Sequence, residues 1–299
     1  MRILATADLH YNVRRGVAPT RRLAAEIVAA APDALLLVGD CAANDLDILE
    51  QCLHLFDRLR APKFYVPGNH ELWVGRHGDS LRRYEHELPA AAGRCGFDCL
   101  DAGPRLVGDV GFVGSIGWYD YAFADPVIEV PARFYQAKVG PGAAGQFAEH
   151  RGLLGDDLSD RARGVIARWM DGVHVRLGVD DAAFLDRLLD RLDAHLREVS
   201  VRAERIVVAT HHLPFAELLP RNCAEPPPNH RTLGGSDNWS FADAYMGSPR
   251  IGELIRRFDK VRWALSAHSH WPARATVNGI DAINIGSGYH QKRFVTIEV

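Results

Sequence analysis

The chain has 299 residues, of which 47% are hydrophobic, enough to form one large core. Its 35 basic and 38 acidic residues nearly cancel, so the totals show no strong electrostatic attraction for nucleic acid or an anionic membrane surface. No apolar stretch approaches the roughly 20 residues that a membrane-spanning helix needs, and the N-terminal apolar run is too short for a secretion signal. We therefore expect one domain spanning residues 1–299, located in the cytoplasm and without a membrane partner.

The cysteines do not form a disulfide framework. They number five, and their spacing is irregular. Cys95 and Cys99 could form half of a zinc site, but no second pair lies nearby, so ordinary packing is favoured. We expect reduced thiols.

The first part of the chain predicts alternating strands and helices. Short apolar runs predict strands at residues 2–7, 34–38 and 63–66, and apolar residues at helical spacing predict helices at 20–31 and 46–60. This βαβαβ order implies a parallel sheet with right-handed crossovers.

The pattern changes after these elements. Residues 105–107 and 110–113 predict a hairpin that starts a second, more antiparallel sheet. Residues 118–178 are irregular and predict an insertion over one edge of a site, whereas 184–196 predict an amphipathic helix. The stretch 220–240, rich in Pro, Asn and Gly, predicts a long loop. The remaining predictions are strands at 205–209, 262–265, 274–277, 282–285 and 293–299, and a helix that starts at Pro249.

Residue types that bind metal ions follow several of the predicted strands. They are Asp8, His10, Asp40, Asn69, His70, His211, His268 and His270. Since the carboxyl ends of parallel strands meet at one edge of a sheet, these side chains are expected to converge there. Residues two apart in an extended strand point the same way, so Asp8 with His10 can reach one ion, as can His268 with His270 if the chain is still extended there.

Such a ligand set favours a two-metal hydrolytic site. Asp40, directly after a buried strand, is the best candidate for a carboxylate that bridges two cations. Asp8, Asp40 and a bridging hydroxide would reduce the repulsion between two divalent ions about 4 Å apart. Asn69 and the imidazoles are neutral, so the site would stay positive and attract a phosphate ester. We expect the bridging hydroxide to attack phosphorus in line with the leaving oxygen.

The ordered motifs resemble those of the calcineurin-like metallophosphoesterase superfamily. They are Asp8-Leu9-His10, Gly39-Asp40, Gly68-Asn69-His70-Glu71, His211 and Ala267-His268-Ser269-His270. The resemblance implies a four-layer αββα sandwich of two mixed sheets flanked by helices, with the dimetal site at the carboxyl ends of the central strands. It also implies one metal held by Asp8, His10, Asp40 and His270, and a second held by Asp40, Asn69, His211 and His268. His70 would then lie outside the metals and protonate the leaving group or hold the phosphate.

The chain departs from the family pattern at two positions. Ala267 replaces a glycine before the last histidine pair, a small change. Ala43 stands where the family often has another aspartate, so no role is transferred there.

Each fragment has a simpler interpretation when it is taken alone. Asp-x-His and Gly-Asp are common turns, and only their joint order favours the dimetal site. Glu71 is expected to anchor its turn through backbone hydrogen bonds rather than to act as a base. His212 could contact substrate or only pack. Four aromatic residues could line a substrate pocket, although such residues more often belong to a core: Trp118, Tyr119, Tyr121 and Trp239. Three arginines could pair with a phosphate, although exposure to solvent is favoured for each: Arg14, Arg15 and Arg231.

The predicted function is a metal-dependent hydrolase of a phosphomonoester or phosphodiester, with a small-molecule ester as substrate. Manganese, iron or zinc would suit the mixed nitrogen and oxygen ligands. Three alternatives stay open: a DNA or RNA nuclease, which would need a local basic groove, a protein phosphatase, and a non-catalytic scaffold. The sequence leaves the ester, the choice of metals and the oligomeric state undetermined.

Overall fold

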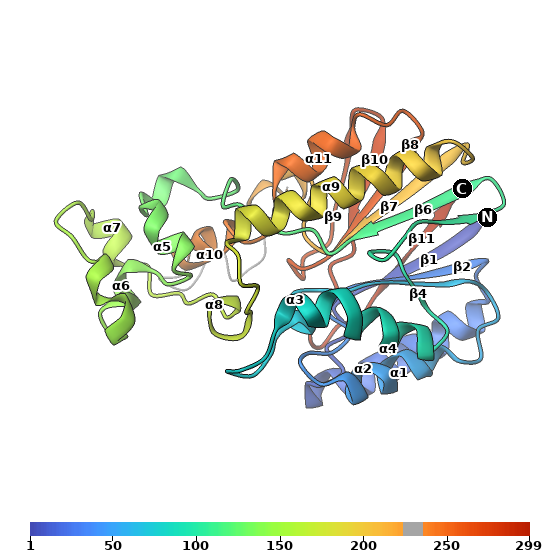
Figure 1. The fold of residues 1–299 in the computed structure, drawn as a ribbon, viewed down its shortest axis with the longest axis horizontal. Helices are drawn as coiled ribbons and strands as arrows, with labels where there is room; N and C mark the ends of the chain where they lie inside the picture. Colours follow the sequence, from blue (N-terminus) through green and yellow to red (C-terminus); the bar gives the residue numbers. More distant parts are fainter. Residues whose placement is uncertain (224–235) are drawn as a thin grey trace.

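The alternating strands and helices at the start of the chain build the first of two sheets (Figure 1). In the computed structural model, which describes residues 1–223 and 236–299, this sheet has the strand order β11-β1-β2-β3-β4. Strands β1 (Arg2–Thr6), β2 (Ala34–Val38), β3 (Lys63–Val66) and β4 (Asp98–Cys99) are parallel, and β11 (Phe294–Glu298) runs antiparallel to β1.

Helices cover the outer face of this sheet (Figure 1). They are α1 (Arg14–Ala30), α2 (Leu46–Leu53), α3 (Ser80–Arg82) and α4 (Leu88–Arg94); His54–Phe56 form a 3₁₀ turn and Arg83–Glu87 a π-helical turn. Helix α1 begins earlier than predicted, with Pro19 inside it. Helix α2 ends earlier than predicted, because the chain tightens into the 3₁₀ turn.

The second sheet has the strand order β5-β6-β7-β8-β10-β9. Its strands are β5 (Arg105–Val107), β6 (Val110–Ser115), β7 (Arg205–Thr210), β8 (Val261–Ser266), β9 (Ala273–Val277) and β10 (Ile280–Asn284). The hairpin of β5 and β6 is as predicted, and this sheet is more antiparallel than the first, since two of its pairs are antiparallel (β5 with β6 and β9 with β10) against one in the first. Its central strands β6, β7, β8 and β10 are nevertheless parallel. The parallel order of β6, β7 and β8 follows because long crossovers containing α9 (Asp181–Ser200) and α11 (Pro249–Ile255), rather than tight turns, connect them. Strand β10 lies parallel to β8 because the chain first passes through the edge strand β9.

The two sheets pack face to face, and α9 and α11 cover the outer face of the second sheet (Figure 1). The layer between the sheets is apolar, and the rings of Phe64 and Phe112 meet there with centroids 4.6 Å apart. Strand β2 is buried along its whole length, which explains its continuous apolar run. The predicted α/β sandwich of two mixed sheets flanked by helices is confirmed.

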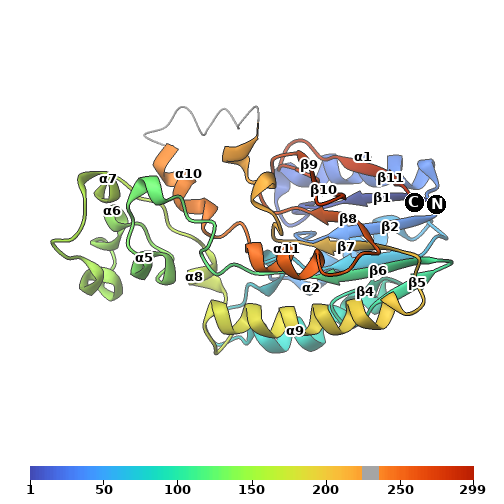
Figure 2. The same cartoon turned by 90° about the horizontal axis from the view of Figure 1, so that it is seen from above.

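A lobe of short helices lies beyond one end of the sandwich (Figures 1 and 2). It contains α5 (Ala132–Gln136), α6 (Pro141–Ala144), α7 (Asp160–Arg163), α8 (Asp171–His174) and α10 (Ser236–Asp243), with 3₁₀ turns at Pro126–Ile128 and Ala148–Leu153. The lobe faces the end of the sandwich opposite to the two chain termini, and β1 and β2 run toward it (Figure 1).

The predicted long loop at 220–240 is wrong in part. Pro220–Asn222 form a 3₁₀ turn, and Ser236–Asp243 form α10. Residues 224–235 lie outside the described part of the chain. One domain with specificity insertions at 118–178 and 220–240 stays a prediction.

Two other expectations concern the whole chain. All five cysteines are free, as predicted. Among residues 1–223 and 236–299, the helices are too short or too polar to cross a membrane.

Candidate dimetal centre

Loops at the ends of five strands bring seven of the predicted ligands together, facing the lobe. Their residues follow β1, β2, β3, β7 and β8: Asp8 and His10, Asp40, Asn69, His211, and His268 and His270. All seven are buried except His270, which is partly buried. Backbone bonds join the loops, since Asp8 N donates to Gly39 O, His10 N to Asp40 O, and Ala267 N to His211 O.

Asp8 and His10 lie in one group of ligand atoms, but strand alternation does not place them there, and the condition set for His268 and His270, an extended chain, is not met. Strand β1 ends at Thr6 and β8 at Ser266, before the ligands begin. Five of the seven have left-handed backbones, with φ values of 50° at Asp8, 43° at His10, 51° at Asp40, 71° at His268 and 58° at His270. Non-glycine residues rarely adopt this conformation, and its recurrence here is typical of a functional site whose surroundings hold the strain.

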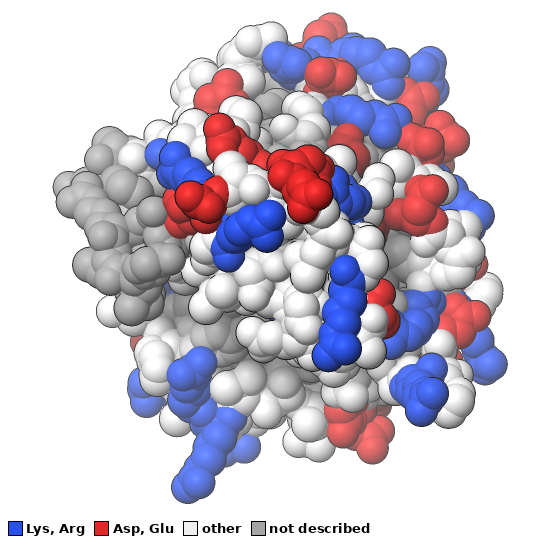
Figure 3. Space-filling view, turned by 90° about the vertical axis from the view of Figure 1, so that its left-hand side faces the viewer, with Lys and Arg blue, Asp and Glu red and all other residues white. Residues whose placement is uncertain are grey.

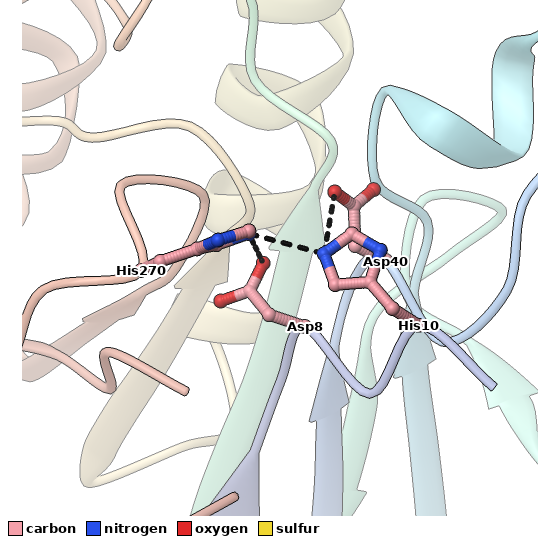
Figure 4. Close-up of side chains that lie close together, drawn as sticks. All are labelled: Asp8, His10, Asp40 and His270. Atoms are coloured by element: carbon pink, nitrogen blue, oxygen red, sulfur yellow. Dashed lines mark hydrogen bonds and ion pairs between the residues drawn. The ribbon is translucent and has the colours of Figure 1, made fainter. Parts of the chain in front are cut away.

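The first group of ligand atoms contains Asp8, His10, Asp40 and His270 (Figure 4). His10 Nε2 lies 3.0 Å from His270 Nε2 and 3.8 Å from Asp40 Oδ2, and His270 Nε2 lies 3.6 Å from Asp8 Oδ1. Two ring nitrogens facing each other beside two carboxylates form a set of atoms that suits a divalent cation.

The second group contains Asp40, Asn69, His211 and His268. His211 Nε2 lies 3.2 Å from Asn69 Oδ1, 3.2 Å from His268 Nδ1 and 3.6 Å from Asp40 Oδ1. Asp40 therefore presents Oδ2 to the first group and Oδ1 to the second. His211 Nδ1 lies 3.1 Å from the carbonyl of Val38, which would fix the ring and leave Nε2 as an acceptor or ligand.

The electrostatics of the two groups fit a cationic occupant. Burial raises the pKa values of Asp8 and Asp40 well above the ordinary value and lowers those of His10, His211 and His268. Asp8 Oδ2 is buried without a hydrogen-bond partner in the described structure. A buried carboxylate without compensation is costly, and bound divalent ions would supply that compensation.

Glu71 supports the bridging position, as the sequence predicts. Its carboxylate accepts hydrogen bonds from the backbone N–H groups of Asp40 (2.9 Å), Ala42 (2.8 Å) and Gly68 (2.6 Å). Burial raises its pKa to about 7, and these three bonds oppose that rise. Glu71 thus fixes the loop after β2 against the turn after β3 and is not itself a ligand.

His70 lies beside both groups and belongs to neither. Its Nε2 is 3.7 Å from Asp40 Oδ2, and its backbone N donates to Asp40 Oδ1 at 3.0 Å. The ring stacks on Trp73 with centroids 3.9 Å apart, and its side chain stays 20% exposed. This position leaves His70 able to meet a group bound at the metal centre.

Sequence reasoning missed Asp171, which begins α8 in the lobe. Its Oδ1 accepts from Asn69 Nδ2 (2.9 Å) and Trp73 Nε1 (2.8 Å), and its Oδ2 accepts from Trp169 Nε1 (2.8 Å) and Tyr119 OH (3.1 Å). No local motif could have shown this, because the partners are spread along the sequence.

Sequence reasoning also missed two residues near the C-terminus, the basic Lys292 and the aromatic Tyr289. Lys292 Nζ donates to the carbonyl of Asp8, and burial lowers the pKa of this lysine to about 8. The Tyr289 ring lies 4.6 Å from the His10 ring, and the Arg15 guanidinium lies 4.6 Å from the Tyr289 centroid. Arg14 and Arg15 are both exposed, as the sequence favours, and the Arg15 guanidinium lies near the centre.

The other residues that the sequence offered as possible substrate contacts have different surroundings. Trp118 and Tyr119 are fully buried in the core, and Trp239 is 42% exposed. His212 is buried, with Nδ1 3.0 Å from the Ile116 carbonyl, and its ring centroid lies 4.4 Å from that of His268. Arg231 lies outside the described residues.

Comparison with known families agrees with this geometry. Residues 1–135 match the family model described as calcineurin-like phosphoesterase. Over these residues, slightly less than half of the chain, the sequence resembles that family. The predicted resemblance to the calcineurin-like metallophosphoesterases is thereby confirmed, and so is the predicted enzyme class, a metal-dependent hydrolase of phosphoric esters. A search among curated proteins finds no match.

Solved structures share the fold over nearly the whole chain. Phosphopantetheinyl hydrolase from Mycobacterium tuberculosis aligns with a TM-score of 0.67 and 18% identity, covering 96% of this chain and 89% of its own. A dimetal phosphatase from Danio rerio aligns with a TM-score of 0.53 and 12% identity, covering 99% and 91%. Protein TT1561 of Thermus thermophilus aligns with a TM-score of 0.53 and 12% identity, covering 99% and 97%. At these identities the likeness shows the fold alone.

Proposed function

We propose that this chain is a dimetal phosphoesterase that hydrolyses a phosphomonoester or phosphodiester of a small molecule. Asp8, His10, Asp40 and His270 would hold one cation, and Asp40, Asn69, His211 and His268 the other. The observation that carries the proposal is the position of Asp40, whose two oxygens face two separate groups of ligand atoms. Manganese, iron and zinc all suit this set of imidazole and oxygen ligands.

Two bound cations would neutralise charge on the phosphoryl group and lower the pKa of a water molecule between them. The chain's own residues provide the positioning. Asp40 and Asn69 fix the spacing of the two groups, and the buried imidazoles stay neutral because burial lowers their pKa values. The ligands contribute only two carboxylates, so the occupied centre would remain cationic and bind an anionic ester.

His70 is placed to act on the leaving group. It lies next to Asp40 but outside both groups of ligand atoms, and it borders the cavity beside the centre. Burial lowers the pKa of His70 to about 4, so its neutral ring would donate a hydrogen bond to the phosphate. It would donate a proton to the departing oxygen where the negative charge of a bound ester raises that pKa. Its stacking on Trp73 holds the ring in place for either role.

The test is hydrolysis of an aryl phosphate ester with manganese by the wild type, Asp40→Ala and Asn69→Ala, together with metal analysis. Both variants should lose activity, and Asp40→Ala should lose both metals. Asp156→Ala, an exposed aspartate in the lobe, is the matched control and should behave as the wild type. Near-normal turnover in either site variant would refute the proposal. Phosphopantetheinyl esters belong in the substrate panel, because one structural neighbour is named for acting on them.

A nuclease activity is less well supported. Acidic and basic side chains alternate over the lobe face in Figure 3, where no continuous basic groove is seen among the coloured residues. Binding to oligonucleotides, titrated against salt, would show whether another face attracts nucleic acid.

A further inference from the structure

A cavity of about 600 Å³ adjoins the candidate dimetal centre. Asp40, Asn69, His70, His268 and His270 line it on the side of the centre. The volume lies within the range of roughly 300–1,000 Å³ that is typical of pockets for small organic ligands.

The largest side chains on the other walls of this cavity are aromatic, and charged side chains, among them Arg15 and Arg168, also line it. Four of the chain's six tryptophans line it, together with Tyr289: Trp73, Trp169, Trp239 and Trp271. They come from separate parts of the chain, namely the turn after β3, the lobe, α10 and the segment after β8. Tryptophans that only pack into a core commonly lie along one face of a single helix. These four come from separate segments, so a structural role alone does not account for their convergence.

Two of these tryptophans are held in fixed positions. Trp73 and Trp169 both donate their indole N–H groups to Asp171, each at 2.8 Å. Trp169 also stacks on Tyr245, with centroids 4.9 Å apart and an angle of 5° between the rings. The Trp73 ring already stacks on the rings of His70 and His174, with centroids 3.9 Å and 4.6 Å away. Because the indole N–H groups of Trp73 and Trp169 are bonded within the protein, the surface that these two side chains leave to a ligand is carbon. A wall fixed before binding loses little entropy when a ligand arrives.

The carboxylates of the cavity are also committed to internal partners. Asp171 accepts the four bonds described above, and Asp243 is paired with Arg221 Nη1 at 2.7 Å. The arginines of the lining lie over aromatic rings, Arg15 over Tyr289 and Arg168 over Phe147, at 4.6 Å and 4.0 Å from the centroids. A ligand rich in hydroxyl groups would lose hydration against the indoles, which could not replace it. A planar, apolar group would gain from burial and stacking.

We propose that this cavity binds the organic group of the ester and selects esters whose organic group is large, planar and apolar. The inference rests on the proposed function, because the phosphoryl group must lie at the dimetal centre for the organic group to reach these walls. Trp239 and Trp271 would be specificity-determining residues.

The test uses phosphonates, which resemble the ester but have no bond to hydrolyse. Methyl-, phenyl- and 2-naphthylphosphonate would be titrated by calorimetry into the manganese-loaded wild type, Trp239→Ala and Trp271→Ala. Trp239 is 42% exposed, so its truncation should not open the core. Ile166→Ala is the matched control, because Ile166 is an apolar side chain of the lobe that is 63% exposed and does not line the cavity.

We expect naphthylphosphonate to bind the wild type at least about tenfold more tightly than methylphosphonate, as burial of an added aromatic surface predicts. In each tryptophan variant this ratio should fall by roughly threefold or more, and in the control it should not change. Equal affinities for all three phosphonates in the wild type would overturn the inference while leaving the dimetal centre intact. The inference would also be overturned if the tryptophan variants left the ratio of the two affinities unchanged, or if Ile166→Ala lowered that ratio as much as they do. If methylphosphonate and inorganic phosphate both fail to bind, the proposed function itself fails and the inference falls with it.

Discussion

Asp171 accepts a hydrogen bond of 2.9 Å from Asn69 Nδ2 and so joins the lobe to the strand-end loop of the sandwich. This bond fixes which end of the Asn69 amide faces His211, whose Nε2 lies 3.2 Å from Asn69 Oδ1. An outer partner of this kind typically tunes metal affinity through the ligand that it orients.

Asp171→Asn should weaken the second metal site. Asparagine replaces one acceptor oxygen by an NH₂ group, which would face donors that the carboxylate now satisfies. We expect kcat/KM to fall by roughly 10–100-fold and activation to need more manganese. The measurement is initial rate against manganese concentration.

Asp181→Asn is the matched control for that prediction. Asp181 is another buried carboxylate, which accepts hydrogen bonds from Trp118, Tyr121 and Lys138 but none from a predicted metal ligand. Both variants should unfold at lower temperature, but only Asp171→Asn should shift the manganese dependence. An equal shift in both would reduce Asp171 to a residue needed for folding alone.

His70→Ala should retain its metals but slow turnover. If His70 is the proton donor, the loss should be greatest, on the order of 10²–10⁴-fold, for esters with poor leaving groups. Rates for a series of aryl and alkyl esters, with metal content measured in parallel, test this expectation. His77→Ala, at an exposed position nearby, should have no effect. A uniform loss across the series would mean that His70 steadies the phosphate instead.

The resemblance of the motifs implied the sandwich, and the sequence predicted its central strands well because they are apolar on both faces. The continuous runs of β2 and β7 can be recognised without knowing their neighbours. Whether β8 and β10 pair in parallel could not be predicted from their composition, because the direction of a strand depends on the path of the chain that leads to it.

The convergence of the candidate ligands could be predicted from the order of the motifs, but their backbone conformation could not. The left-handed φ of Asp8 and of His268 arises where separate loops bond to each other, as when His268 N approaches Asp8 Oδ1 at 3.3 Å. Asp171 could not be found either, because it lies 102 residues from Asn69 and no periodic pattern connects them.

Gly68→Ala should disrupt the centre through steric contact. A Cβ atom at this position would lie 2.1 Å from Asp40 Oδ1 and 2.5 Å from Asp40 N. Because the backbone nitrogen is held by Glu71, the bridging carboxylate would have to move. We expect weaker metal binding and a free energy of unfolding lower by about 1–3 kcal/mol. Gly75→Ala, where a Cβ meets nothing within 4 Å, is the control. Equal metal content and stability in the two variants would contradict this account.

Asp101 should make stability depend on pH. It is buried, its Oδ1 accepts from Tyr84 OH (2.5 Å) and Ile116 N (2.7 Å), and its Oδ2 is buried with no hydrogen-bond partner among the described residues. Burial is the main reason that its pKa rises to about 6. In the unfolded chain the pKa of an aspartate is about 3.9. Between these two values the folded protein binds more protons than the unfolded chain.

The sign of the effect follows from that difference in bound protons. As pH rises from about 4 to about 6, the contribution of Asp101 to the free energy of unfolding should fall by roughly 1–3 kcal/mol and then level off. Asp101→Asn cannot titrate. Urea unfolding of both proteins across this range should therefore show the wild type losing stability relative to the variant as pH rises. A difference that stays constant, or that grows in favour of the wild type at higher pH, would mean that Asp101 is already ionised in the folded protein at low pH.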